Sequence, residues 1–275
     1  MNHIHERIGS LAARSLLLEV AATPKPGLVD RRNCGSHRDM NFYTFVNSAF
    51  ALEPHFSSMA LEGFITASDP LETLFAHMRL FGKAAEKDMF AATNGVNTHK
   101  GALFSLGLLC GALGREYALK GSLSAEGACL TVANMSKGIC QKEFSGLKEK
   151  LILTKGERMY LQYGVTGARG QAESGFESVH KVFLPYLKGL ISSGMCEDEA
   201  YVRTLLKICA CTEDTNIMSR AGINEARKAM QDCSAVFQDY SEEKAAALDD
   251  EFIRRNISPG GCADLLAVTI FLSLL

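Results

Sequence analysis

The spacing of apolar side chains is the feature of this sequence that most narrows its fold. In residues 4–22 the apolar positions recur every three or four residues, and similar spacing returns along most of the 275-residue chain. Alternation of apolar and polar residues with β-branched enrichment, which is typical of strands, is nearly missing; only "CLTVANM" and "KLILT" are ambiguous. The sequence therefore predicts an all-α protein.

Capping residues, prolines and glycines divide the chain into about ten predicted helices. Asp39, Thr98, Ser124 and Ser241 are predicted N-caps, and the prolines of "TPKPG" end the first helix. Pro185 is expected to kink one later helix. No linker or repeat interrupts the pattern, so one domain is predicted over residues 1–275. The predicted helices with two clear ends cover 4–22, 70–91, 99–119, 171–192, 197–211 and 222–238, and further helices follow Asp39, Ser124, Ser241 and Ser258–Pro259.

Two predicted helices are apolar on every side and should be buried at the centre. Residues 102–113 place Gly107, Gly111 and Gly114 on nearly one face, which lets a neighbouring backbone come close. Residues 263–275 form the other central helix, and its apolar surface is also consistent with a homodimer.

Composition excludes several classes of protein. The formal net charge is −2, so there is no basic footprint for nucleic acid. The nine cysteines show no zinc spacing, and their odd number and the polar start "MNHIHERIGS" indicate reduced thiols in a cytoplasmic protein. The longest apolar runs are too short to cross a bilayer, so no membrane is expected.

Five polar stretches rich in glycine, charge or both break the helical pattern and are the candidate functional loops. Such loops at the ends of rigid buried helices are a common arrangement for binding sites. They are "TPKPGLVDRRNCGSHRDM" (23–40), "TNGVNTHKG" (93–101), "YGVTGARGQAESGF" (163–176), "TEDTNIMSRAG" (212–222) and "SPGGCADLL" (258–266).

Two of these stretches have the composition of an anion site at a helix start. In "TNGVNTHKG" the glycines let a ligand approach, and Lys100 sits in the first helical turn, where the helix dipole disfavours a cation. Its presence there favours binding of phosphate. "GVTGARGQAESG" repeats the design with Arg169 and Glu173. The alternative for both is a glycine-capped turn with solvated cations.

Carboxylates, histidines and basic residues fill the other stretches. His37 and Asp39 lie two apart and can reach one metal ion or substrate, unless Asp39 only caps a helix. Asp214 and Asn216 offer oxygen of the kind Mg²⁺ prefers, unless they only form a helix end. Lys25, between two prolines, is held on a stiff segment. Asp264 falls where a helix dipole favours a carboxylate in any case and is given no role.

Taken together, the motifs resemble those of the triphosphoribosyl-dephospho-CoA synthase family. The resemblance keeps the family's order and spans residues 16–272. It is carried by "TPKPGLVDRRNCGSHRDM", "FVNSAFAL", "TNGVNTHKGALFSLGLL", "GVTGARGQAESGF", "DTNIMSR" and "SPGGCADLLA".

This resemblance implies an all-α pentosyltransferase. Members of the family transfer the 5-triphosphoribosyl group of ATP to the 2′-hydroxyl of 3′-dephospho-CoA and release adenine. The product is the precursor of the prosthetic group of citrate lyase or malonate decarboxylase, and it passes to a holo-acyl-carrier-protein synthase. The family's α-linked product from β-linked ATP implies one inverting displacement.

The resemblance and the residue chemistry together give a set of expected roles. Either Glu173 or Asp39 is expected to be the general base, with His37 or His99 assisting. Mg²⁺ is the expected cofactor, with Asp30 and Asp214 as its ligands. The residues expected to bind the triphosphate or nucleotide are Lys25, Arg31, Asn97, Thr98, Lys100, Arg169 and Arg220.

Two other functions share much of this residue chemistry. A Mg²⁺-dependent hydrolase of nucleotides or ADP-ribose-like substrates would use water as the acceptor. A non-enzymatic nucleotide- or CoA-binding module would bind without turnover, and the number of candidate catalytic groups argues against it.

Overall fold

The computed structural model describes residues 3–275, and within that range it contains helices and no strand. The all-α prediction is therefore confirmed, although the helices are more numerous than expected. The longer ones are α1 (Ile4–Ala21), α2 (Phe42–Ile65), α3 (Leu71–Ala92), α4 (Lys100–Lys120), α5 (Ala125–Met135), α10 (Glu197–Cys211), α12 (Ile223–Gln238), α13 (Glu242–Arg254) and α14 (Gly260–Ser273). The shorter ones are α6 (Ile139–Phe144), α7 (Lys155–Tyr163), α8 (Gly167–Glu173), α9 (Leu184–Ser192) and α11 (Thr215–Ala221).

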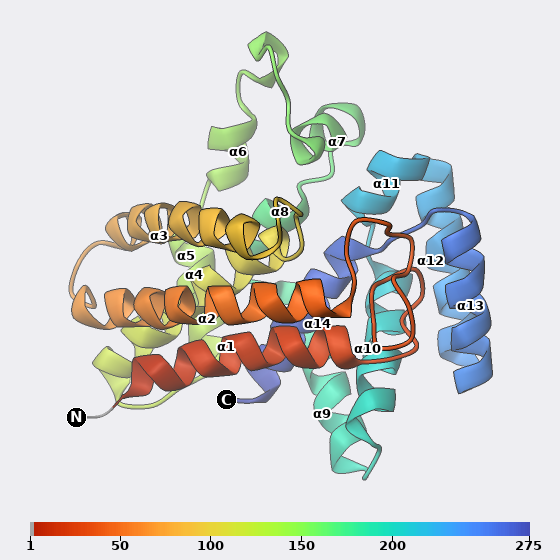
Figure 1. Ribbon diagram of the computed structural model, residues 1–275. Coiled ribbons are helices and arrows are strands. Elements are labelled where there is room, and N and C mark those ends of the chain that lie inside the picture. Colours follow the sequence, from red (N-terminus) through yellow and green to blue (C-terminus); the bar gives the residue numbers. More distant parts are fainter. Residues whose placement is uncertain (1–2) are drawn as a thin grey trace.

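Helices α4 and α14 lie at the centre, as predicted. In Figure 1, α1, α2 and α3 run alongside one another on one side, and α10 to α13 gather near the far end of α1. Helix α4 packs on α2, and α14 packs on α1, α4 and α10. The glycine face of α4 does allow close approach, because a β-carbon on Gly114 would lie 1.9 Å from the carbonyl oxygen of Ala60 in α2.

The apolar surfaces of the two central helices are used inside the chain. Helix α4 is long and apolar enough to cross a membrane by length and composition, but 72% of that window is buried. Nearly every apolar side chain of α14 is also buried. The apolar last helix therefore forms part of the core.

Two predicted N-caps are wrong, and both residues are thereby free for other contacts. Helix α2 begins after Asn41, whose side chain forms a reciprocal capping box with Thr44, so Asp39 caps nothing. Helix α4 has no side-chain cap at its N-cap position, His99. The hydroxyl of Thr98 instead donates to Ser48 Oγ at 2.7 Å. The predicted caps Ser124 and Ser241 are confirmed.

Other predicted boundaries also differ. The stretch 212–222 is not a loop, because Asp214 caps the short helix α11 within it. The helix predicted over 171–192 is broken where Phe176 adopts a positive φ of 55°. Pro185 then lies in the first turn of α9, directly after a stretch of π-helix, Val179–Phe183. Of the two ambiguous segments, "CLTVANM" lies in α5, and "KLILT" contains no strand.

Candidate active site

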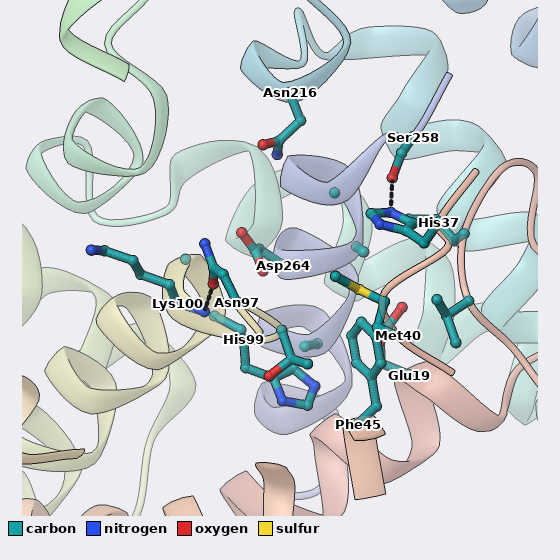
Figure 2. Close-up of a pocket in the computed structure, with 18 of the residues that line it drawn as sticks. Glu19, His37, Met40, Phe45, Asn97, His99, Lys100, Asn216, Ser258 and Asp264 are labelled. Atoms are coloured by element: carbon teal, nitrogen blue, oxygen red, sulfur yellow. Dashed lines mark hydrogen bonds between the residues drawn. The ribbon is translucent and has the colours of Figure 1, made fainter. Parts of the chain in front are cut away.

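One pocket collects side chains from six helices and the segment 22–41, where the first turns of α4 and α14 meet. Figure 2 shows its labelled side chains arranged around Asp264. The lining combines cations, carboxylates and an apolar wall. The lining residues used below are Glu19, Lys25, His37, Asp39, Met40, Phe45, Asn97, Thr98, His99, Lys100, Gly101, Lys155, Asn216, Arg220, Ser258 and Asp264.

The start of α4 forms one wall of the pocket. The Nζ atom of Lys100 lies 2.5 Å from Glu86 Oε1 in α3, and the Lys100 side chain is about half exposed. Asn97 Oδ1 accepts a long hydrogen bond of 3.4 Å from the Lys100 backbone N–H. His99, at the N-cap position, forms no capping bond, so the positive dipole end of α4 lies at the pocket that Lys100 also lines.

His99 is held beneath this wall as a neutral imidazole. It is 3% exposed, its Nδ1 lies 2.8 Å from Ser48 Oγ, and its ring meets Phe45 edge-on with centroids 4.9 Å apart. Burial, with the charge of Lys25, lowers the pKa of His99 to about 3. The ring therefore carries no charge near neutral pH and is poorly suited to act as the general base.

The segment 22–41 is shaped by Asp30. This buried carboxylate accepts hydrogen bonds from the Thr23 hydroxyl at 2.7 Å and from the Lys25 backbone N–H at 2.9 Å. The backbone N–H groups of Arg32 and Asn33 also donate to it. Asp30 thus stabilises the segment that carries Lys25, His37 and Asp39, but its own side chain does not line the pocket.

Lys25 reaches the pocket as half of a buried ion pair. Its ammonium bonds to Glu19 of α1, and both side chains are at most 5% exposed. Burial, the largest effect, raises the pKa of Glu19, whereas the Lys25 charge opposes that rise. Because the Glu19 carboxylate neutralises the Lys25 ammonium, Lys25 is not a free cation in the pocket.

His37 and Asp39 meet Arg220 and Ser258 on the opposite wall. His37 Nε2 lies 2.9 Å from Ser258 Oγ, and its Nδ1 lies 3.4 Å from Arg220 Nη2 and 3.8 Å from Asp39 Oδ1. Burial, followed by the charge of Arg220, lowers the pKa of His37. The Asp39 side chain is 63% exposed, so its carboxylate can meet an entering substrate.

Eight of the predicted site residues line this pocket and five do not. Those outside it include Glu173, which accepts a 2.6 Å hydrogen bond from the Gly138 backbone, and Arg169, which pairs with Glu143 at 2.5 Å. Arg31 pairs with Asp198 on the surface. Asp214 caps α11 and accepts from the Cys262 N–H at 2.8 Å, so the helix-end alternative weighed for it is what the structure shows. The fifth is Asp30.

Several pocket residues were missed by sequence reasoning. Glu19 follows the buried residues Ile8, Ala12 and Leu16 on one face of α1, and a carboxylate on such a face is a signal. Ser258 belongs to the motif "SPGGCADLL", but its side chain was assigned no role from the sequence. Lys155 had no sequence signal, because its helix was not predicted.

The metal expectation has a limited structural basis. Within residues 3–275 no group of three or more His, Cys, Asp or Glu side chains is arranged to hold a metal ion. The carboxylate oxygens of Asp30 and Asp214 already accept hydrogen bonds from backbone N–H groups. A protein cage for a cation is thus absent from this part of the chain.

Comparison with known proteins decides the family. The model of the CitG family, ATP:dephospho-CoA triphosphoribosyl transferase, matches residues 5–275. This chain belongs to that family. It is 44% identical over 277 residues to a protein of Albidiferax ferrireducens named probable 2-(5''-triphosphoribosyl)-3'-dephosphocoenzyme-A synthase, covering 98% of this chain and 90% of that protein.

Other similar proteins agree. A 2-(5''-triphosphoribosyl)-3'-dephosphocoenzyme-A synthase of Escherichia fergusonii is 41% identical over 273 residues, which cover 97% of this chain and 90% of that protein. A crystal structure from Archaeoglobus fulgidus, named as a triphosphoribosyl-dephospho-CoA synthase, matches with a TM-score of 0.53 at 18% identity. It covers 82% of this chain and 96% of its own, and it shows a shared fold. The predicted family resemblance is confirmed.

Proposed function

We propose that this chain transfers the 5-triphosphoribosyl group of ATP to the 2′-hydroxyl of 3′-dephospho-CoA and releases adenine. The single observation that carries the proposal is that one pocket joins the start of α4, with its cation, to two carboxylates in different surroundings. Lys100 stands at that helix start, Asp39 is exposed, and Asp264 is half-buried against Gly101. Family membership supplies the two substrates.

The triphosphate is kept intact in this reaction, so the protein must hold it without cleaving it. The start of α4 suits this task because Lys100, Thr98 and the helix dipole act on the same space. Arg220 and Lys155, which line the same pocket, would then bind the pyrophosphate of the acceptor. The apolar wall with Met40 and Phe45 suits the adenine ring.

Asp39 is the best-placed general base. The acceptor hydroxyl must lose a proton as its oxygen attacks C1′ of the ribose. Asp39 is the exposed carboxylate of the pocket, and His37 beside it can hydrogen-bond the same hydroxyl. Glu173, the other base predicted from the sequence, lies outside the pocket against Gly138.

We also propose that Mg²⁺ enters with ATP. The ion prefers phosphate oxygens, water and only one or two protein oxygens, which fits a pocket without a cage of carboxylates. The pocket residue that would hold it is Asn216, whose side-chain amide faces the start of α14 near Gly260. When bound, the ion would neutralise part of the triphosphate charge. Replacing Asn216 with alanine should weaken binding of ATP with Mg²⁺ more than binding of ATP alone.

The product is proposed to serve an acyl carrier protein. By family, it would be the precursor of the prosthetic group of citrate lyase or malonate decarboxylase, passed to a holo-acyl-carrier-protein synthase in the cytoplasm. Growth on citrate or on malonate by a deletion strain separates the two pathways.

Mass spectrometry with omission controls tests the proposed reaction. Purified protein is incubated with ATP, 3′-dephospho-CoA and Mg²⁺, and each component is left out in turn. Adenine together with a triphosphoribosyl adduct is expected only when both substrates are present. Release of adenine or ribose products from ATP alone would instead show the hydrolase that shares this residue chemistry.

A further inference from the structure

Asp264 is a pocket carboxylate that lies where the N-terminal parts of the two central helices meet. It belongs to the second turn of α14, which begins at Gly260, and it lines the pocket. Figure 2 shows it in the middle of the labelled side chains, between Asn97 and α14. Its Oδ2 atom occupies the space next to Gly101, where a β-carbon would lie only 2.0 Å away. The Ala102 backbone N–H, in the same turn of α4, donates to this carboxylate.

The surroundings of Asp264 favour its neutral, protonated form. Burial, followed by the negative charges of Asp214 and Glu19, raises its pKa well above the usual range, and the hydrogen bond from the Ala102 N–H opposes this rise only in part. Within residues 3–275 no lysine, arginine or histidine forms an ion pair with it. The other charged or titratable groups of the pocket are Glu19 paired with Lys25, neutral His99, Lys100 paired with Glu86, and His37, Asp39, Lys155 and Arg220; Asp214 lies before α11.

Asp264 and Asp39 have different environments within one pocket. Asp39 is exposed to solvent, whereas Asp264 is half-buried, with its carboxylate against Gly101 of α4. A carboxyl group that its surroundings keep protonated is suited to act as a general acid.

We propose that Asp264 is the general acid that protonates adenine as it leaves. This inference rests on the proposed transferase function. The acceptor oxygen forms a bond to C1′ and loses its proton to Asp39. The bond between C1′ and adenine N9 breaks, its electron pair stays on adenine, and adenine takes the proton of Asp264. Exchange with solvent returns both carboxyl groups to their starting state, so protons and electrons balance.

A substrate that needs no acid separates this role from a structural one. In 7-methyl-ATP the purine already carries a positive charge and leaves as neutral 7-methyladenine without taking a proton. Asp264→Asn keeps a side-chain oxygen that can accept from the Ala102 N–H. With ATP its turnover should fall by about 100-fold or more, the usual size of a general-acid contribution. With 7-methyl-ATP it should stay within a few-fold of wild type.

Two controls complete the experiment. Asp250→Asn, an exposed carboxylate change on α13, should leave both rates unchanged. ATP binding by Asp264→Asn should match wild type, which shows that the pocket is intact. Equal losses with both substrates, or full activity with ATP, would overturn the assignment.

The wild-type protein alone gives a second measurement that does not depend on a variant folding. An acid must be protonated to act, so kcat/KM with ATP should fall as pH rises through the raised pKa of Asp264. The same fall should be missing with 7-methyl-ATP. An identical alkaline limb with both substrates would overturn the proposal, as would failure to turn over bound 7-methyl-ATP. Absence of any transfer with ATP and 3′-dephospho-CoA would instead refute the transferase function.

Discussion

Asp264 Oδ2 occupies the space that the absence of a side chain at Gly101 leaves open. A β-carbon built on Gly101 would lie 2.0 Å from that oxygen and 2.9 Å from Asp264 Cγ. The glycine in "THKG" is thus required by a carboxylate from a helix more than 150 residues further along the chain. The first turn of α4 and the second turn of α14 therefore fit closely against one another at the pocket.

Gly101→Ala should displace Asp264 and lower turnover at least ten-fold. Alanine is the better helix former by about 1 kcal/mol, so any loss must come from the contact with Asp264. Gly82→Ala in α3 is the matched control, because a β-carbon there meets nothing within 4 Å. It should keep full activity and unfold at slightly higher denaturant. Equal activity of the two variants in steady-state assays would show that the contact between Gly101 and Asp264 does not matter for turnover.

Lys100→Ala should weaken ATP binding ten-fold or more without affecting folding. A charge-assisted hydrogen bond to phosphate contributes about 1.5–3 kcal/mol. In the free protein Lys100 pairs with Glu86, so Glu86→Gln should leave ATP affinity equal or higher. Calorimetric titration measures both, with Lys181→Ala as an exposed control that pairs with Glu177. Unchanged ATP affinity of Lys100→Ala would show that Lys100 is a solvated surface cation with no part in ATP binding.

Asp39→Asn and Glu173→Gln should separate the two predicted bases. Asp39 is exposed at the pocket, so its loss should reduce kcat by 100-fold or more, as expected for a general base. Glu173 accepts from the Gly138 backbone, and glutamine can accept the same bond. Its variant should keep ordinary turnover. If the kinetic effects are reversed, the pocket assignment is wrong and the region around α8 is the site.

His99 should make the free energy of unfolding depend on pH. The folded pKa is lowered to about 3, below the 6.5 of an unfolded histidine. Between these values the unfolded chain binds more protons, so the free energy of unfolding falls as pH falls, by up to about 1.4 kcal/mol per unit. His99→Gln should lack this contribution. Urea unfolding at pH 7 and pH 5 compares the two proteins, and the same pH dependence for both would show that His99 titrates normally.

The fold and much of the pocket could be predicted from sequence because their signals are local. The apolar, glycine-faced stretch 102–113 marks a central helix, and the loops that precede α4 and α14 mark the pocket. The rest depends on contacts between distant residues. Whether Asp39 caps a helix depends on Asn41 competing for that role. The burial of Glu19 with Lys25, and the close contact of Asp264 with Gly101, arise only when separate segments pack together.

Glu173 and Arg169 show the opposite case. Their glycine-rich stretch has the composition of an anion loop, yet both side chains are taken by residues 138 and 143. Composition cannot show that a neighbouring segment supplies the partner.

A crystal structure of the protein with ATP, Mg²⁺ and 2′-deoxy-3′-dephospho-CoA tests the central claim most directly. This acceptor lacks the attacking hydroxyl, so both ligands remain intact. The account predicts the triphosphate at the start of α4 beside Lys100, and the ribose C1′ between Asp264 and Asp39. Nucleotide bound instead over α8, against Arg169 and Glu173, would contradict it.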